Sequence, residues 1–349
     1  MLVTFLDDGY TFDGSTKDNH PLGGSEKSLI LLAESLTTIG HIVRVFNNCK
    51  RTTVVNGVSW NPIKNMKATH SDVWIVHNNP LLFNQIDNNT KKILWLTKSG
   101  LKLVQPQYFS ITMKHRPTLV YQGENHLDSI PDAVKSLDAA MIPPAIPDYY
   151  LNQAELVPSV TPIALVTSHP LMGLEWLLDV WYNKIHTKLP WAELHIFSNI
   201  LSKFIEGKNI SERYNAIIKK IEDKEKFNII IRKPLMDKEM VLEMKNMRVH
   251  LYPSHDSEVG AFTLSESQAL GLPAVVRNKG VAPYRIINGK TGFVSNDDQS
   301  FADFSIRFLD DRNAFERASA EAKKNNTRTA KKLAMEFIKV ISGIHLNEK

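Results

Sequence analysis

The chain has 349 residues, of which 43% are hydrophobic and 23% are charged, a composition typical of a globular protein that folds in water. Its length favours two domains, each large enough to bury a core of its own. The formal charge of +5 comes without a dense stripe of basic residues and interleaved aromatics, which argues against a nucleic-acid partner. A phosphate-bearing ligand, an anionic membrane surface and a solvated surface with spare lysines all fit this charge.

The cysteine content and the apolar runs indicate where the protein works. Cys49 is the single cysteine, so no disulfide forms within the chain and a reducing compartment is favoured. No apolar run approaches the roughly 20 residues that cross a bilayer, and no basic-then-apolar signal peptide opens the chain. We expect a cytoplasmic protein, with the inner face of the membrane as a further place of action.

The N-terminal segment predicts a β-α-β unit. Residues 2–6 form a short apolar strand, and a polar loop leads to Gly23 and Gly24. Apolar residues then recur at the spacing of one helix face, and Gly40 ends this helix before a strand at residues 41–46. Glycines at a helix entrance let the backbone approach a ligand, and the helix N-terminus favours an anion. An ordinary tight turn is the alternative for this glycine pair.

Three further strands of the N-terminal half, at residues 72–77, 91–97 and 119–121, each end in polar residues. Because the carboxyl ends of parallel strands gather at one edge of a sheet, we expect these polar residues near a ligand. His77 and Lys98 are the candidates. A histidine at a strand end is more often a surface histidine or one satisfied by its neighbours, and for His77 this alternative stays open.

Prolines mark a boundary near the middle of the chain. Residues 143–147 contain the richest cluster, and prolines resist helix and favour extended linkers. We place the boundary at Glu155, so that residues 1–155 form one domain and residues 156–328 form the other. The α/β rhythm then restarts, and an amphipathic helix is predicted over residues 329–346. Strands of the second domain are expected at residues 162–167, 192–198, 227–231, 248–252 and 274–276.

The most informative stretch runs from residue 252 to residue 276. A buried strand is followed by a loop that contains Glu258 and by a helix that is expected to begin at Thr263, with Glu266 in its first turn completing a capping box. In a parallel sheet, the crevice at the carboxyl end of such a strand binds ligands, and the first amides of the helix are donors for an anion. In the alternative interpretation, Glu266 is only a helix cap and Glu258 is an exposed loop acid.

This stretch resembles the Glu-x7-Glu signature of the large group-1 family of retaining GT-B glycosyltransferases. Glu258 and Glu266 have the required spacing, and residues 269–276 read Ala-Leu-Gly-Leu-Pro-Ala-Val-Val, similar to the family's Ala-x-Gly-x-Pro-Val-Val. The N-terminal segment resembles the family too, in residues 23–26 (Gly-Gly-Ser-Glu) and residues 40–43 (Gly-His-Ile-Val). The resemblance therefore rests on motifs near both ends of the chain.

The resemblance implies an α/β protein of the GT-B class, in which two doubly wound Rossmann-like domains face each other across a cleft. It also implies that the helix at residues 329–346 crosses back to complete the first domain, on the acceptor side, while the second domain binds the nucleotide sugar. The implied activity is a retaining transfer of a sugar from a nucleotide diphosphate sugar to a hydroxyl acceptor, without a metal or another cofactor.

Roles for individual residues follow from the same resemblance. Glu258 and His77 would lie beside the transferred sugar as catalytic residues, and Glu266 would accept hydrogen bonds from the ribose. The residues expected to bind the donor are Glu266, Gly260, Ala261, Phe262, Thr263, Lys233 and Ser168. Those expected at a phosphate or at the acceptor are Gly23, Gly24 and Lys98.

Two departures from the family pattern bear on activity. Where the family has Arg and then Lys-Gly, which neutralise the donor diphosphate, residues 168–173 read Ser-His-Pro-Leu-Met-Gly, so that Met172 takes the place of the Lys. Lys98 or Lys233 could supply the missing charge. The family's Gly-Phe-Gly after the first Glu is replaced by residues 259–261, Val-Gly-Ala.

These departures keep two other functions open. One is a catalytically impaired member of the family that binds nucleotide sugars as a binding or assembly subunit, and the missing cations favour it. The other is a different enzyme on the same fold, such as a sugar-nucleotide epimerase. The two-glutamate string argues against the epimerase.

Overall fold

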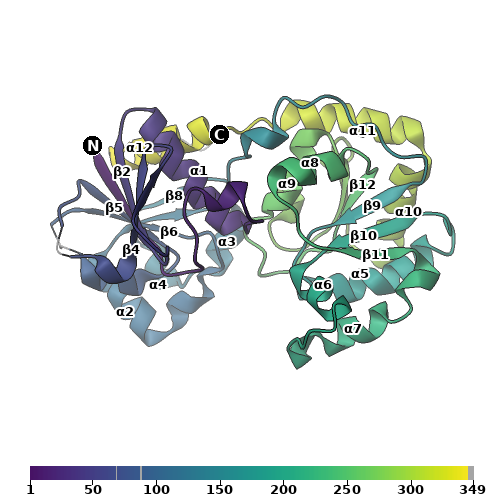
Figure 1. Ribbon diagram of the computed structural model, residues 1–349, viewed down its shortest axis with the longest axis horizontal. Coiled ribbons are helices and arrows are strands. Elements are labelled where there is room, and N and C mark those ends of the chain that lie inside the picture. The colour runs from purple at the N-terminus through teal and green to yellow at the C-terminus, as the bar shows by residue number, and fades with distance from the viewer. Residues whose placement is uncertain (68, 87–88, 345–349) are drawn as a thin grey trace. The chain divides into compact units, whose positions relative to one another are not determined.

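The computed structural model describes residues 1–67, 69–86 and 89–344. The chain divides into two compact units (Figure 1). Unit 1 comprises Met1–Pro147 and the segment that begins at Arg328, and unit 2 comprises Asp148–Thr327. The division thus lies N-terminal to the expected boundary at Glu155. Residues 345 and 346 of the predicted last helix lie outside the described residues.

Unit 1 is built on an eight-stranded sheet with the order β3-β4-β2-β1-β5-β6-β7-β8. All neighbouring strands run parallel except β3 and β4, which are antiparallel. The strands are β1 (Leu2–Leu6), β2 (Ile42–Asn47), β3 (Thr53–Val55), β4 (Val58–Pro62), β5 (Val73–His77), β6 (Lys91–Trp95), β7 (Thr118–Tyr121) and β8 (Ala139–Met141). The strand order reverses between β1 and β5, so their carboxyl ends flank the crevice where such sheets bind ligands.

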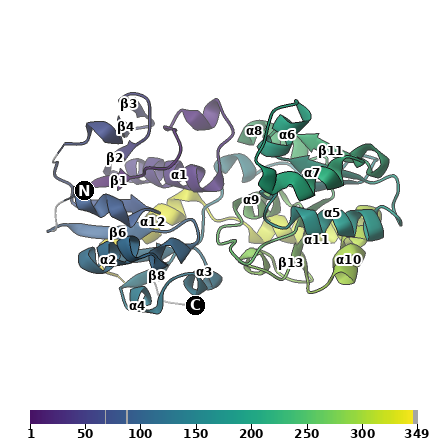
Figure 2. The same ribbon diagram turned by 90° about the horizontal axis from the view of Figure 1, so that it is seen from below.

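Helices cover both faces of this sheet (Figure 2). α1 (Gly24–Thr38) and α12 (Ala330–Ile341) share one apolar core with the strands, and α2 (Pro106–His115) packs on the other core with α3 (Glu124–Asp128) and α4 (Asp132–Lys135). The predicted apolar face of α1 is buried, because Leu29, Leu32 and Leu36 have no exposed surface. α12 lies beside α1, although most of the chain separates the two helices in sequence (Figure 1).

Strands β3, β4, β8 and β14 (Gly292–Ser295) were not predicted from the sequence. β3 and β4 form a hairpin whose turn residues are Asn56 (φ 49°) and Gly57 (φ 79°). Asn-Gly between two β-branched segments is the strongest short-range signal for a hairpin, because both turn residues adopt positive φ readily. This signal was therefore present in the sequence.

Unit 2 is built on a six-stranded parallel sheet with the order β11-β10-β9-β12-β13-β14. The strands before β14 are β9 (Ile163–Val166), β10 (Glu193–Phe197), β11 (Ile229–Arg232), β12 (Val249–Tyr252) and β13 (Ala274–Arg277). All five were predicted within a few residues. Here the strand order reverses between β9 and β12, so the loops that follow these two strands flank the ligand crevice of this sheet.

The helices of unit 2 also lie on both faces of its sheet (Figure 1). They are α5 (Leu174–Val180), α6 (Asn199–Ile205), α7 (Asn215–Ile221), α8 (Asp237–Met244), α9 (Phe262–Leu270), α10 (Asp298–Asp310) and α11 (Arg312–Asn325). α5 and α10 share a core with the central strands, whereas α9 packs in a second core with β13. Within the described parts of the chain, no helix combines the length and the apolar character needed to cross a membrane.

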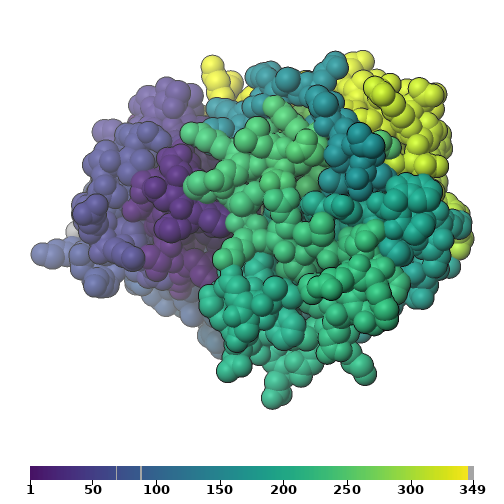
Figure 3. Space-filling view, turned by 45° about the vertical axis from the view of Figure 1, so that its right-hand side comes forward, coloured from purple at the N-terminus to yellow at the C-terminus, as the bar shows by residue number. Residues whose placement is uncertain are grey.

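The segments on either side of the unit boundary are hydrogen-bonded to the units that they join. In unit 1, Arg328 donates through Nε to the Pro143 carbonyl at 3.0 Å and accepts from the Ile146 amide at 2.9 Å. In unit 2, Lys323 of α11 donates through Nζ to the Gln153 carbonyl. The teal segment that enters unit 2 accordingly lies beside α11, which is yellow in Figure 3. The proline cluster is therefore a bound part of unit 1, not a free linker.

Candidate functional site

The loops after β9 and β12 meet at the crevice of unit 2. Gly173, in the first loop, is so close to the second that an added Cβ would lie 2.9 Å from the Ser254 carbonyl oxygen. In the same place, Ser257 Oγ lies 3.8 Å from the sulfur of Met172. The structure thus brings the loop at residues 168–173 next to the Glu258 loop and the start of α9.

α9 begins earlier than predicted, and the predicted capping box is wrong. The N-cap is Ala261, in the left-handed conformation with φ 47°, and no side chain caps the helix. Thr263 lies inside the helix, and its hydroxyl accepts a 2.7 Å hydrogen bond from Thr167 instead. Glu266 is consequently in the second turn. A left-handed residue starts the helix two residues before Thr263, and a capping-box pattern in sequence does not show this conformation.

Glu258 is half-buried and its carboxylate is held in place. Its Oε1 accepts from the Ala261 amide at 3.1 Å, so the Ala261 amide, expected at the donor, is used by the protein itself. The pKa of Tyr252 is raised well above its usual value, first by burial and then by the charge of Glu258, with which it hydrogen bonds. Glu258 is therefore a fixed acceptor beside a protonated phenol, not a mobile loop acid.

The amides that remain at the start of α9 belong to Phe262, Thr263 and Leu264, and helix geometry gives them no acceptor within the helix. The Phe262 ring packs over Gly260, where an added Cβ would lie 2.3 Å from the ring. A side chain at position 260 would thus displace Phe262. Glycine at this position lets the chain turn tightly from the Glu258 loop into the helix.

Glu266 is 4% exposed and lies near Tyr150 at the start of unit 2. The pKa of Tyr150 is raised well above its usual value by burial and then by the charges of Glu266 and Asp237. Its hydroxyl donates to Asp237 Oδ1 at 2.9 Å. The acidic group at position 266 is therefore part of a buried polar cluster, which sequence spacing alone did not indicate.

Gly173 is required by its backbone conformation as well as by its neighbours. Its φ is +95°, which L side chains rarely adopt, and an added Cβ would meet the Ser254 backbone. We expect Gly173→Ala to lower the free energy of unfolding by about 2 kcal/mol or more, since left-handed strain and a backbone clash add. The thermal unfolding midpoint of the full chain measures this.

Gly207→Ala is the matched control for that substitution. Gly207 has a similar φ of +77° but no atom within 4 Å of an added Cβ. Gly207→Ala therefore introduces the backbone strain without the clash, and it should lower the free energy of unfolding by less than Gly173→Ala does. Equal losses in the two variants would contradict the close contact between the loops after β9 and β12.

The two cations predicted to replace the missing family pair lie on different units. Lys233 is exposed and pairs with Glu206, and hydrogen bonds from Lys208 and Lys233 lower the pKa of Glu206 to about 2. Lys98 belongs to unit 1.

Arg285 is a cation at this crevice that was not predicted from the sequence. Its Nε donates to the Gly260 carbonyl at 3.2 Å, and its charge acts on the Tyr252 hydroxyl beside Glu258. Arg285 follows β13 by several residues, in a short helix at Ala282–Arg285. No motif marks it, because only the folded loop brings it to the start of α9. Ser168, in the loop after β9, is a further polar residue here, and it is buried next to Tyr252.

A buried histidine anchors α9 to the central strands. His250 of β12 is fully buried, its Nδ1 lies 2.8 Å from Ser267 Oγ on α9, and its Nε2 lies 3.0 Å from Thr167 Oγ1 after β9. Burial lowers the pKa of His250 to about 3. The ring is therefore neutral in the folded protein at all ordinary pH values.

This burial makes stability depend on pH. The unfolded chain binds a proton at His250 below pH 6.5, whereas the folded chain binds it only near pH 3, so the free energy of unfolding falls as pH falls from 6.5 towards 3. For one such group the slope reaches about 1.4 kcal/mol per pH unit. We expect His250→Gln to have a shallower slope by about this amount between pH 6 and pH 4.5, measured by denaturant unfolding. Equal slopes would mean that His250 is not buried neutral.

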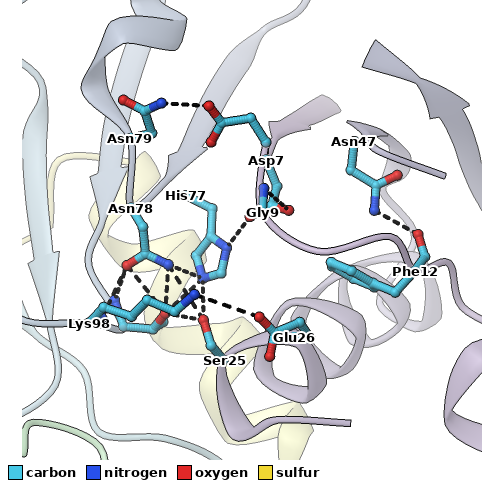
Figure 4. Close-up of polar contacts among 12 residues, drawn as sticks. Asp7, Gly9, Phe12, Ser25, Glu26, Asn47, His77, Asn78, Asn79 and Lys98 are labelled. Carbon is cyan, nitrogen blue, oxygen red and sulfur yellow. Dashed lines mark hydrogen bonds and ion pairs between the residues drawn. The ribbon is translucent and has the colours of Figure 1, made fainter. Parts of the chain in front are cut away.

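In unit 1, His77 is buried in a polar network at the carboxyl ends of β1, β5 and β6 (Figure 4). Its Nδ1 lies 2.8 Å from Asp7 Oδ1, and its Nε2 lies 2.8 Å from Thr97 Oγ1, which in turn lies 2.6 Å from Ser25 Oγ. Since the Asp7 carboxylate accepts, the ring proton sits on Nδ1 and Nε2 accepts from the hydroxyl side. With 2% exposure, the His77 side chain is enclosed by this network, and its predicted catalytic role stays a prediction.

Asn78 joins the same network and orients the chain after β6. Its Oδ1 accepts from the Thr97 amide at 2.8 Å and from the Lys98 amide at 3.1 Å (Figure 4). Its Nδ2 lies 2.9 Å from Thr97 Oγ1. The network thus sets the backbone that presents Lys98.

The glycine pair opens α1 as predicted, but the anion at this helix end is the protein's own. Gly23 is the N-cap, and an added Cβ there would lie 2.5 Å from Glu26 Oε2. Lys98 Nζ lies 3.7 Å from Glu26 Oε1 (Figure 4). The Glu26 carboxylate thus lies at the start of α1, beside Gly23 and Lys98, and the expected phosphate or acceptor role of Gly23, Gly24 and Lys98 stays a prediction.

Among residues 1–67, 69–86 and 89–344, no three His, Cys, Asp or Glu side chains gather in a way that could hold a metal ion. The acids of these polar clusters instead hydrogen bond with neighbouring side chains, as Asp7 does with His77.

Comparisons with known proteins agree with this architecture. Residues 197–325, within unit 2, match the family model described as glycosyl transferases group 1. No curated protein sequence matches the chain. The matched segment contains Glu258, Glu266 and Arg285.

Several solved structures share the fold. Sucrose-phosphate synthase from Thermosynechococcus elongatus is 12% identical, with a TM-score of 0.74, and 98% of each chain is covered. WaaG, a glycosyltransferase involved in lipopolysaccharide biosynthesis, is 12% identical with a TM-score of 0.67, over 98% of this chain and 100% of that one. TarM of S. aureus, solved as a mutant with UDP among its ligands, is 13% identical with a TM-score of 0.60, over 77% of this chain and 55% of that one. The predicted α/β GT-B class, with two Rossmann-like domains, is confirmed.

Proposed function

We propose that this chain, whose residues 197–325 match the model of glycosyl transferases group 1, transfers a sugar from a nucleotide diphosphate sugar to a hydroxyl acceptor with retention at the anomeric carbon. One observation carries the proposal. A fixed carboxylate, Glu258, a cation, Arg285, and the first amides of α9 converge at the crevice between β9 and β12. This combination suits a sugar joined to a diphosphate.

Each group has a task in the proposed reaction. The bond between the anomeric carbon and the diphosphate oxygen breaks, and the acceptor oxygen forms the new bond to that carbon. The leaving diphosphate gains negative charge and takes up the proton that the acceptor hydroxyl loses. Arg285 and the amides of Phe262 and Thr263 stabilise that charge, because donors already in position need no reorganisation. Glu258 hydrogen bonds the sugar hydroxyls and holds the reacting carbon towards the acceptor.

We assign the ribose to Glu266, whose carboxylate accepts from the two ribose hydroxyls as the resemblance implies. In this chain Glu266 lies in a buried cluster with Tyr150. The rigid setting favours one orientation of the nucleoside. Nucleotide binding then requires an opening at Glu266, since the side chain is 4% exposed.

Unit 1 provides the acceptor side in this proposal. Gly23, Gly24 and Lys98 lie together at the start of α1, and the His77 network fixes the backbone before Lys98. His77 acts there as a positioning residue. In this proposal the reaction needs neither a metal ion nor another cofactor, because Arg285 and the α9 amides stabilise the negative charge of the diphosphate. We place the activity in the cytoplasm, with the inner membrane face as a further site of action.

A second candidate function is a binding or assembly subunit that holds a nucleotide sugar without turnover. The observation that favours it is the loop at residues 168–173, which has no cation of its own. Arg285, which donates to the Gly260 carbonyl, would then face the diphosphate without a cation from that loop.

A ligand panel on the full chain tests the proposal. UDP, GDP, ADP and dTDP, each free and as its glucose derivative, are screened by thermal shift, and the best ligand is then assayed for donor hydrolysis. We expect one nucleotide to raise the unfolding midpoint in the parent and less so in Glu266→Gln. Binding with hydrolysis supports the enzyme, binding without hydrolysis or transfer supports the subunit, and no shift with any ligand contradicts both.

Met172→Lys restores a cation to the first loop. Met172 is half-buried with its sulfur near Ser257, and a Lys side chain can extend its ammonium from such a position towards solvent. We expect a gain in nucleoside diphosphate affinity of about 10-fold, because a charge-assisted contact to phosphate is added. Titration calorimetry measures it, and Met172→Gln controls for lost packing. Unchanged affinity in a folded Met172→Lys protein would contradict the alignment of this loop with the family's Lys.

A further inference from the structure

A second pocket lies at the opposite edge of the unit 2 sheet. It has a volume of about 360 Å³ and is formed by the turn before β14 and by helices α10 and α11. Lys290 comes from the turn, Arg307 from α10 and Arg317 from α11. Because β14 runs parallel to the other strands, the residues before it lie at the amino edge, away from Glu258. We call this the distal pocket.

The three cations of the distal pocket are not neutralised by the protein. Within the described residues, Lys290, Arg307 and Arg317 have no ion-pair partner. Glu321 is the one carboxylate among the lining residues. Three cations facing one carboxylate give the distal pocket an excess of two positive charges. Like charges held together without a counter-ion repel one another, so an anion that joins them gains favourable energy.

One of these cations lies over an aromatic ring. The Arg307 guanidinium lies over the Phe293 ring, 5.5 Å from its centroid, and Phe293 stacks on Phe304 with ring centroids 4.1 Å apart. This contact favours one orientation of the planar guanidinium, and so reduces part of the ordering cost of binding.

The buried part of the distal pocket's lining is apolar. Phe308, Ala314 and Ala318 line it and are nearly fully buried. Apolar lining with a few convergent polar groups is the usual construction of a small-molecule site, and a volume of about 360 Å³ lies within the range of such sites. A bare inorganic ion would leave this apolar lining unused.

We propose that the distal pocket binds a small phosphate ester whose phosphate meets Lys290, Arg307 and Arg317 and whose apolar or aromatic group packs on Ala318 and Phe308. A phosphate monoester carries about −1.5 to −2 charges at pH 7, which matches the excess of two positive charges. A carboxylate carries half as much. Arginine also binds phosphate with paired hydrogen bonds. The proposal is independent of the sugar-transfer site, because it involves none of its residues.

Phenyl phosphate is the probe, titrated into the full chain and followed by ligand-observed NMR, with inorganic phosphate and phenol as separate ligands. We expect phenyl phosphate to bind about 10-fold or more tightly than either fragment, and Arg317→Gln or Lys290→Gln to weaken it about 10-fold or more. Both residues are exposed, so the variants should fold. Inorganic phosphate binding as tightly as phenyl phosphate would overturn the proposal, because the apolar lining would then contribute nothing.

Two controls locate the binding. Lys324→Gln removes an exposed charge from α11 outside the distal pocket, and the affinity for phenyl phosphate should not change. If Lys324→Gln weakened binding as much as Arg317→Gln does, the overall charge of the protein would explain both losses, and the proposal would be overturned. Arg285→Gln disables the cation of the sugar-transfer site. Phenyl phosphate should bind this variant as it binds the parent. Loss of binding in Arg285→Gln alone would assign the phosphate to the β9–β12 crevice and contradict a distal site.

Discussion

Replacing Glu258 by Gln is expected to lower the rate of sugar transfer by about 100-fold or more while the protein stays folded. The carboxylate accepts from the Ala261 amide and hydrogen bonds with Tyr252, and Gln retains the shape and an acceptor oxygen for the first contact. What it loses is the negative charge beside the reacting sugar. Removal of one preorganised electrostatic contact of this kind costs roughly 10²-fold or more in turnover. Turnover of the donor identified by the ligand panel measures the effect.

Asp256→Asn is the matched control for Glu258→Gln. Asp256 lies in the same loop, is exposed, and pairs with Lys279 at 2.8 Å. Its neutralisation changes the loop's charge by the same amount without reaching the crevice. A rate close to that of the parent in Glu258→Gln, or equal losses in the two variants, would remove Glu258 from the reaction.

Arg285→Gln is expected to weaken the binding of a nucleoside diphosphate by about 10- to 100-fold. Hydrogen bonds to charged groups contribute roughly 1.5–3 kcal/mol, and each 1.4 kcal/mol corresponds to a factor of about ten in affinity. Arg285 donates to the Gly260 carbonyl in the turn before α9, so its charge lies where the phosphates would meet the helix N-terminus. Titration calorimetry with the free diphosphate separates this effect from catalysis.

Lys233→Gln distinguishes the two candidate cations. The sequence suggested Lys233 for the diphosphate, but the structure pairs it with Glu206. We therefore expect Lys233→Gln to leave the affinity unchanged. Should Lys233→Gln weaken binding while Arg285→Gln does not, the phosphate site would have to be moved to the end of β11.

The sequence determined the fold class and most of the elements. Buried parallel strands read as continuous apolar runs, as in Val249–Tyr252, and the apolar face of α1 recurs at helical spacing. These patterns are local, because they reflect burial along one element and its period. The sequence also predicted that Glu258 lies in the loop after β12, because the local patterns of strand, loop and helix follow one another along residues 249–270.

Only the tertiary structure decided how the sites are built. Ala261 takes a left-handed conformation that its sequence does not favour, and this moved the start of α9 away from Thr263. Arg285 reached the crevice through a contact with Gly260 across 25 positions, and His77 was enclosed by Asp7, 70 positions away. Such contacts depend on which loops the sheet order brings together. Spacing along the chain carries no information about them, so the cation and the buried histidine became visible only in the folded protein.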